Sequence, residues 1–198
     1  IAAQNSAGTS YGSEASFITS APPDTTAPSG SITISRPGYS DASYTNSTTI
    51  TLTLSATDNI GVTGYYISDS SSTPSASASG WTSVTSTTSY SATVSYSLSG
   101  GEGGKTIYVW YKDAAGNVSN SASDTIILDT TAPTVNITSP TTDTTYTTTS
   151  STISLSGSAS DSSSGIDSSS LKWSNNRGGN GFVRGGASWT TTSDISLS

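Results

Sequence analysis

The stretch YKDAAGNVSNSASDTIILDTTAP, residues Tyr111–Pro133, has the pattern of two strands, a turn and a break. Lys112 and Asp113 close an expected strand, and the turn 114–117 contains Gly and Asn, which tolerate positive φ best. The next strand, Thr125–Leu128, is rich in β-branched residues. The junction Asp129–Pro133 ends in proline, which has no N–H and stops strand pairing. The stretch therefore indicates the end of one β domain and the beginning of the next.

The junction motif DTTAP occurs twice, at Asp24–Pro28 and at Asp129–Pro133, 105 residues apart. This spacing is close to the ~100 residues of an immunoglobulin-like sandwich and longer than a solenoid repeat. Between the junctions, alternating apolar residues and turn signals predict seven strands, at 31–35, 48–55, 62–68, 82–85, 91–98, 105–112 and 123–128. Val109 and Tyr111 share one face of the most apolar strand, and Tyr108 and Trp110 share the other, so either face or parts of both can be buried. We predict that Val109 or Tyr111 is a core anchor.

The pattern KDAAGN…D-T-x-x-L-D-T-T-A-P, between Lys112 and Pro133, resembles the end of a bacterial immunoglobulin-like repeat, a kind found in tandem in secreted and surface proteins. The resemblance covers residues 24–198. Residues 5–17, NSAGTSYGSEASF, resemble the end of a fibronectin type III module. We therefore predict an all-β chain of tandem immunoglobulin-like β-sandwiches, one complete and two partial. The expected domains are the last two strands of a fibronectin type III-like or immunoglobulin-like domain (1–22), a complete sandwich (23–131) and a domain that lacks its last strands (132–198).

The two partial domains carry predictions of their own. At the N-terminus, residues 1–4 are expected to end a strand, residues 5–11 to form a turn and residues 14–19 to form the final strand. Near the C-terminus, residues 146–161 parallel residues 44–58, and Trp189 parallels Trp81. Because the two tryptophans occupy matching places in the repeats, we predict that they pack in cores rather than stack on sugars.

Composition excludes several classes of protein. The net charge is −7, and the six Lys and Arg residues are scattered singly, so no basic patch suggests a nucleic-acid partner. No apolar run approaches the ~20 residues of a membrane helix, so no membrane insertion is expected. The chain has no Cys, which excludes a disulfide scaffold and a thiolate zinc site. About two-fifths of the residues are Ser or Thr, but alternating apolar residues interrupt the Ser/Thr runs and argue against disorder.

Motifs that suggest catalysis are weak in this chain. Residues 8–12, GTSYG, match the nucleophile elbow G-x-S-x-G, but that motif needs a strand-to-helix turn and a His base, and the chain contains no His. Asp58 and Asp113 are two carboxylates of the type that glycosidases use, yet paired carboxylates at loop ends are common in such repeats. We therefore expect a protein that is not an enzyme.

Acidic and amide side chains gather at one expected end of the sandwich. Asp58 and Asn59 follow the second strand, Asp113 ends the last hairpin's first strand, and Asp24 enters from the junction. Oxygen ligands from several loops suit Ca²⁺, and the arrangement is similar to the inter-domain calcium sites of cadherin-like strings. We therefore predict a Ca²⁺ site at these residues and a second site at Asp129 and Asp161. The alternative is that these side chains cap turns through backbone hydrogen bonds.

The resemblance implies an extracellular structural role, as a stalk, an adhesin spacer or a filament subunit on the cell surface or in a secreted protein. The alternative is an accessory carbohydrate-binding module of a secreted hydrolase, with surface polysaccharide as the partner. Expected partners are flanking domains of a longer chain or neighbouring copies of this one. In the second case residues 1–19 of one copy would complete the last domain of the next, with Ala15, Phe17 and Thr19 on one face of the donated strand.

Overall fold

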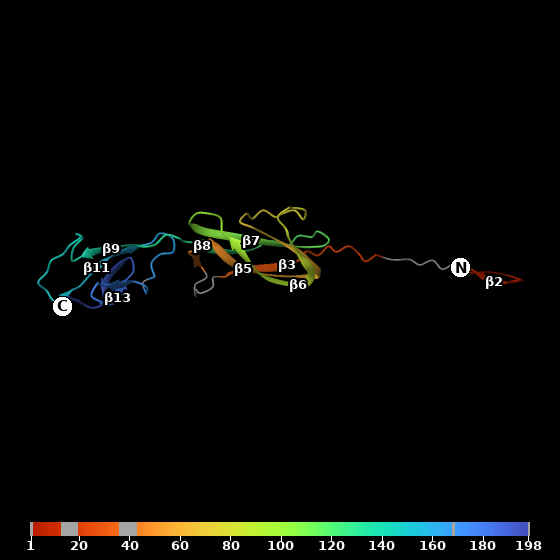
Figure 1. Ribbon diagram of the computed structural model, residues 1–198. Helices are drawn as coiled ribbons and strands as arrows, with labels where there is room; N and C mark the ends of the chain where they lie inside the picture. The colour runs from red at the N-terminus through yellow and green to blue at the C-terminus, as the bar shows by residue number, and fades with distance from the viewer. Residues whose placement is uncertain (1, 13–19, 36–42, 168, 198) are drawn as a thin grey trace.

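The computed structural model describes residues 2–12, 20–35, 43–167 and 169–197, and these residues form β-strands and no helix (Figure 1). The prediction of an all-β chain of immunoglobulin-like sandwiches is confirmed. In this part of the chain, no helix is long and apolar enough to span a membrane. The predicted domain boundaries stay predictions, and the fold is described here by its N-terminal, middle and C-terminal segments.

The N-terminal segment is a tight hairpin of β1 (Ala2–Asn5) and β2 (Gly8–Tyr11). The side chain of Asn5 accepts a hydrogen bond from the Ala7 N–H at 2.8 Å, which closes the turn after two residues. The prediction of a turn over residues 5–11 is therefore wrong, because this local hydrogen bond lets the strand resume at Gly8. The strand expected at residues 14–19, with Ala15, Phe17 and Thr19, lies outside the described residues.

The middle segment contains the six strands that place the candidate site. They are β3 (Ser29–Ser35), β4 (Tyr44–Thr45), β5 (Thr49–Ser68), β6 (Thr82–Ser97), β7 (Gly103–Asp113) and β8 (Ala122–Leu128). The strands pair in the order β3-β5-β7-β8-β4, and β6 also pairs with β5. The β4–β8 pair is parallel and the other pairs are antiparallel.

Two pairs of predicted strands are continuous in the structure. β5 covers the strands predicted at 48–55 and 62–68, and β6 covers those at 82–85 and 91–98. The β5–β6 register shifts between Thr57 and Val62. Before the shift β5 pairs with β3, and after it β5 pairs with β7. The turn signal at Asp58 therefore marks a β-bulge within one strand, between the part that pairs with β3 and the part that pairs with β7, and not the end of a strand.

The core of the middle segment is built by buried residues of β3, β5, β7 and β8, together with Leu98 after β6. Its buried apolar residues are Ile32, Ile34, Ile50, Leu52, Leu54, Ala56, Val62, Leu98, Ile107, Val109, Tyr111, Ile126 and Leu128. Val109 and Tyr111 are 0% and 1% exposed, so the predicted anchors are confirmed. The Tyr111 hydroxyl donates to the Ser31 carbonyl at 2.6 Å and so links β7 to β3 across the core. Burial raises the pKa of this hydroxyl well above its usual range.

A second aromatic cluster covers the other face of β7. Trp110 is fully buried there, with its ring 6.2 Å from that of Tyr66 and 6.0 Å from that of Tyr108. Trp81 packs edge-on against Tyr66 at 5.6 Å and is half-buried. Trp81 therefore packs outside the sandwich core, contrary to the prediction, because the loop after β5 folds back over the outer face.

The C-terminal segment has a five-stranded sheet and a two-stranded pair. The sheet order is β12 (Lys172–Ser174), β13 (Asn180–Gly185), β14 (Ser188–Thr191), β11 (Ser156–Ser160) and β9 (Thr134–Ser139), and β10 (Thr152–Ile153) pairs with β15 (Ile195–Ser196). Trp189 is 7% exposed and packs with Ala159 and Val183, which confirms its predicted core position.

The Tyr111 link gives a testable prediction for stability. We expect Tyr111→Phe to lower the free energy of unfolding by about 1 kcal/mol, because one buried hydrogen bond is lost. Tyr111→Ala should cost about 3–5 kcal/mol, because the ring also leaves a cavity. Urea unfolding of the whole chain measures both values. Tyr11→Ala is the control, since Tyr11 is 79% exposed; an unchanged transition in Tyr111→Ala would contradict the assignment.

Candidate metal centre

The bend of β5 shapes the first part of the candidate site. One carboxylate oxygen of Asp58, Oδ1, accepts hydrogen bonds from the N–H groups of Ile60 at 3.0 Å and Gly61 at 2.6 Å. Gly61 has φ +157°, and a Cβ at this position would collide with Ser86, so a glycine is needed there. Asp58 is 9% exposed, and its other oxygen, Oδ2, is buried with no hydrogen-bond partner among the described residues.

The turn after β7 supplies the second carboxylate. Asp113, at the end of β7, is 3% exposed. Its Oδ1 accepts from the backbone N–H of Asn117 at 2.8 Å, and its Oδ2 accepts from the Asn117 side-chain amide at 2.6 Å. Asn117 therefore fixes the orientation of the Asp113 carboxylate toward the end of the sandwich.

The junction segment supplies the third carboxylate. Asp24 Oδ1 accepts from the Thr26 N–H at 3.0 Å and from the Asn59 side-chain amide at 3.3 Å. The Asp24 carbonyl accepts from the Asn117 side-chain amide at 3.1 Å. Asp24 Oδ2 is buried and, within the described ranges, has no hydrogen-bond partner. The junction thus reaches both loops of the sandwich end.

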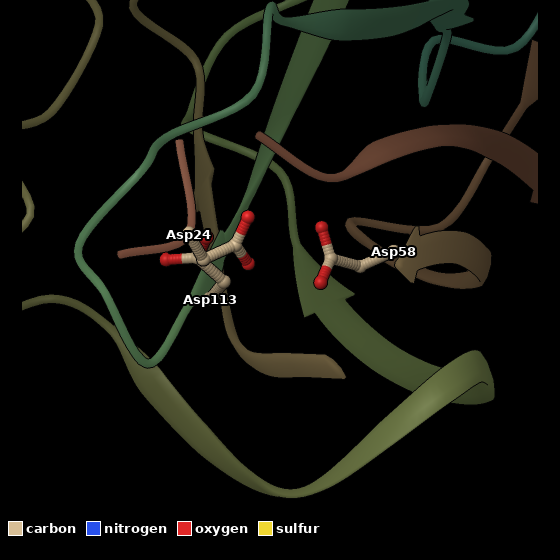
Figure 2. Close-up of side chains that lie close together, drawn as sticks. All are labelled: Asp24, Asp58 and Asp113. Carbon is tan, nitrogen blue, oxygen red and sulfur yellow. The ribbon is translucent and has the colours of Figure 1, made fainter. Parts of the chain in front are cut away.

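The three carboxylates converge on one place (Figure 2), where one oxygen from each lies within 4.8 Å of the others. Figure 2 shows the Asp58 carboxylate facing those of Asp24 and Asp113. The neighbouring cation Lys112 does not balance this charge, because its Nζ donates to the Ala76 carbonyl and lies over the Trp81 ring. Two oxygens on either side of a Ca²⁺, each about 2.4 Å from it, would span this distance. The residues present therefore fit Ca²⁺.

The second predicted site has a different geometry. Asp129 Oδ1 accepts from the Thr131 N–H at 3.1 Å, and its Oδ2 accepts from the Ser164 N–H at 2.9 Å. Asp161 Oδ1 accepts from the N–H groups of Ser163, Ser164 and Gly165. Asp129 and Asp161 are thus brought together by one N–H donor, and no third acidic residue among the described residues joins them.

Hydrogen bonding also affects the ionisation of Asp129. The Ser164 side chain, followed by the Thr131 and Ser164 N–H groups and Asp161, holds the pKa of Asp129 below its usual range, although burial acts in the opposite direction. Asp129 therefore stays ionised at neutral pH while its oxygens accept these hydrogen bonds.

Sequence reasoning missed Glu102 and Ser164. Glu102 stands between two pairs of glycines, and its carboxylate accepts from the Thr130 N–H at 3.0 Å and contacts the Thr130 hydroxyl. The signal that could have identified Glu102 is its position as the single acidic residue of a glycine-rich loop. Ser164 acts through its backbone N–H as well as its side chain, and no residue type in the sequence indicates the backbone role.

The comparisons with known proteins bear on the C-terminal segment. Residues 133–197 match the family described as Bacterial Ig domain. This segment is therefore a bacterial immunoglobulin-like repeat, as the resemblance of the sequence indicated. No curated protein and no solved structure matches the chain.

The crowded carboxylates predict an unusual effect of one substitution in the presence of a chelator. We expect Asp58→Asn to stabilise the protein by about 1–2 kcal/mol, because it removes a negative charge close to two others while Oδ1 can still cap the turn. Urea unfolding at low ionic strength measures this effect. The matched control is Asp143→Asn, which changes an exposed aspartate outside the cluster and should have no effect; destabilisation by Asp58→Asn in chelator would contradict the repulsion.

Proposed function

We propose that this chain is a non-catalytic, extracellular structural module, a spacer of a stalk or surface adhesin or a filament subunit, in which Ca²⁺ fixes the first junction. The observation that carries the proposal is the Asp58 carboxylate, which faces two further carboxylates and whose buried Oδ2 lacks a donor within the described residues. A buried carboxylate oxygen without a donor is costly, so a cation at this place would contribute to the stability of the folded state.

Bridging three parts of the chain would give the ion a mechanical role. Asp24 belongs to the junction, Asp58 to the bend of β5 and Asp113 to the end of β7. An ion that binds all three would hold the junction against the sandwich end and restrict the angle between consecutive modules. Extracellular calcium modules bind at about 10⁻⁴–10⁻³ M, a concentration range found outside cells.

The described residues give less support to the alternative functions. A carbohydrate-binding module would need an exposed platform of aromatic rings, but the four tryptophans are buried or half-buried. The exposed aromatic residues Tyr11, Tyr146 and Phe182 come from three separate strands or loops. For catalysis, the chain has no His or Cys to act as base or thiol nucleophile. The structural role is therefore the function that we propose.

Calorimetry of the whole chain tests the calcium site. We expect millimolar Ca²⁺ to raise the melting temperature of the wild type relative to chelator, since an ion at about ten times its Kd stabilises the folded state by ~1.4 kcal/mol. Asp58→Asn should lose this increase, and the control Asp143→Asn should keep it. Identical wild-type curves in Ca²⁺ and in chelator would end the proposal.

A further inference from the structure

The aspartates of the two DTTAP junctions have the same kind of hydrogen-bond partner at Oδ1 and different surroundings at Oδ2. Asp24 Oδ1 accepts from the Thr26 N–H at 3.0 Å, and Asp129 Oδ1 accepts from the Thr131 N–H at 3.1 Å. Asp24 Oδ2 is buried without a donor in the described part of the chain, whereas Asp129 Oδ2 accepts from the Ser164 N–H at 2.9 Å. The same motif is thus completed by a backbone donor at the second junction only.

Loop length accounts for this difference. The first bend, D-N-I-G, has two residues between Asp58 and Gly61, and the second, D-S-S-S-G, has three between Asp161 and Gly165. In the short loop both donated N–H groups bind Asp58 itself. In the longer loop the Ser164 N–H is shared between Asp161 at 3.0 Å and Asp129 at 2.9 Å. The additional residue therefore presents an N–H to the junction aspartate.

We propose that the first junction is a calcium-dependent joint and the second a calcium-independent one, with the length of the bend loop deciding between them. The inference rests on the proposed calcium site at the first junction. A buried carboxylate oxygen needs a hydrogen-bond donor or a cation. At Asp129 the Ser164 N–H supplies a charge-assisted hydrogen bond, so that oxygen needs no ion. At Asp24 and Asp58 the Oδ2 atoms are buried without a donor among the described residues, and the two carboxylates converge with that of Asp113. One cation at this place would satisfy them together.

The second junction is also held from the preceding sandwich. Glu102, in the loop before β7, accepts from the Thr130 N–H at 3.0 Å and from the Thr131 hydroxyl at 3.3 Å. The linker is thus bonded to the middle segment through Thr130 and Thr131 and to the C-terminal segment through Asp129. These direct bonds connect the two segments without a metal, so removal of Ca²⁺ should loosen the first junction and leave the second in place.

Hydrogen–deuterium exchange of the full chain, followed by mass spectrometry, reads both junctions in one sample. Peptides that cover residues 24–28, 58–62 and 113–118 report on the first junction, and peptides that cover residues 129–133 and 161–166 report on the second. Chelator should accelerate exchange about tenfold at the first junction and leave the second within about twofold, because opening free energies add to exchange protection. The readout needs no label and no isolated domain.

Two matched substitutions, one at each junction, separate the possible results. Asp24→Asn should abolish the effect of Ca²⁺ at the first junction, and Asp129→Asn should accelerate exchange at the second junction equally in Ca²⁺ and in chelator. Protection of both junctions by Ca²⁺ would overturn the inference and leave the proposed calcium site standing. Protection of neither would overturn the calcium site itself, and the inference with it.

Discussion

The bend of β5 between Asp58 and Gly61 is the constraint on which the middle segment depends. One continuous strand pairs with β3 before the bend and with β7 after it, so the bend determines how β3 and β7 are placed relative to each other. The buried face of β5 continues through the bend to Val62, which is fully buried. The Asp58 hydrogen bonds and the backbone of Gly61 hold this geometry, and they also place a carboxylate at the end of the sandwich. Fold and candidate site therefore share the same few atoms.

A chain with only 31% apolar residues can build this core because strands such as β3 and the first half of β5 commit only one face to it. Along the first half of β5, Ile50, Leu52 and Leu54 point inward. The intervening residues are Thr and Ser, and they pair across strands with other hydroxyl residues, such as Thr53 with Thr33 and with Thr93. β-Branched Thr suits a solvated strand face. These Ser and Thr residues therefore form the outer surface of the sheet, and their abundance is not a sign of disorder.

The sequence predicted those parts of the fold that depend on local period and on repetition. Strict alternation located the first half of β5 with its inward side chains, and the run of β-branched residues located β8. It could not predict that Asp58 bends a strand, because the same residue types also end strands, and the choice depends on pairing with β3 and β7. Likewise, the tight turn at Asn5 and the donor role of Ser164 depend on single hydrogen bonds to groups whose positions only the folded chain defines.

The two interpretations of the acidic residues, turn capping and metal binding, are compatible because a carboxylate has two oxygens. In Asp58, Oδ1 caps the bend, and Oδ2 is left buried without a donor among the described residues. Asp24 divides its oxygens in the same way, because its Oδ1 accepts from the Thr26 N–H and its Oδ2 has no such partner. Capping thus orients each side chain before any ion binds, and this lowers the entropic cost of ordering these side chains when a cation binds. Asp129 has both oxygens bonded to N–H groups, so the same residue in the same motif is only a structural link. The bend loop that packs against a junction aspartate, 58–61 or 161–165, therefore decides whether that aspartate keeps an oxygen without a donor. The DTTAP motif itself does not decide it.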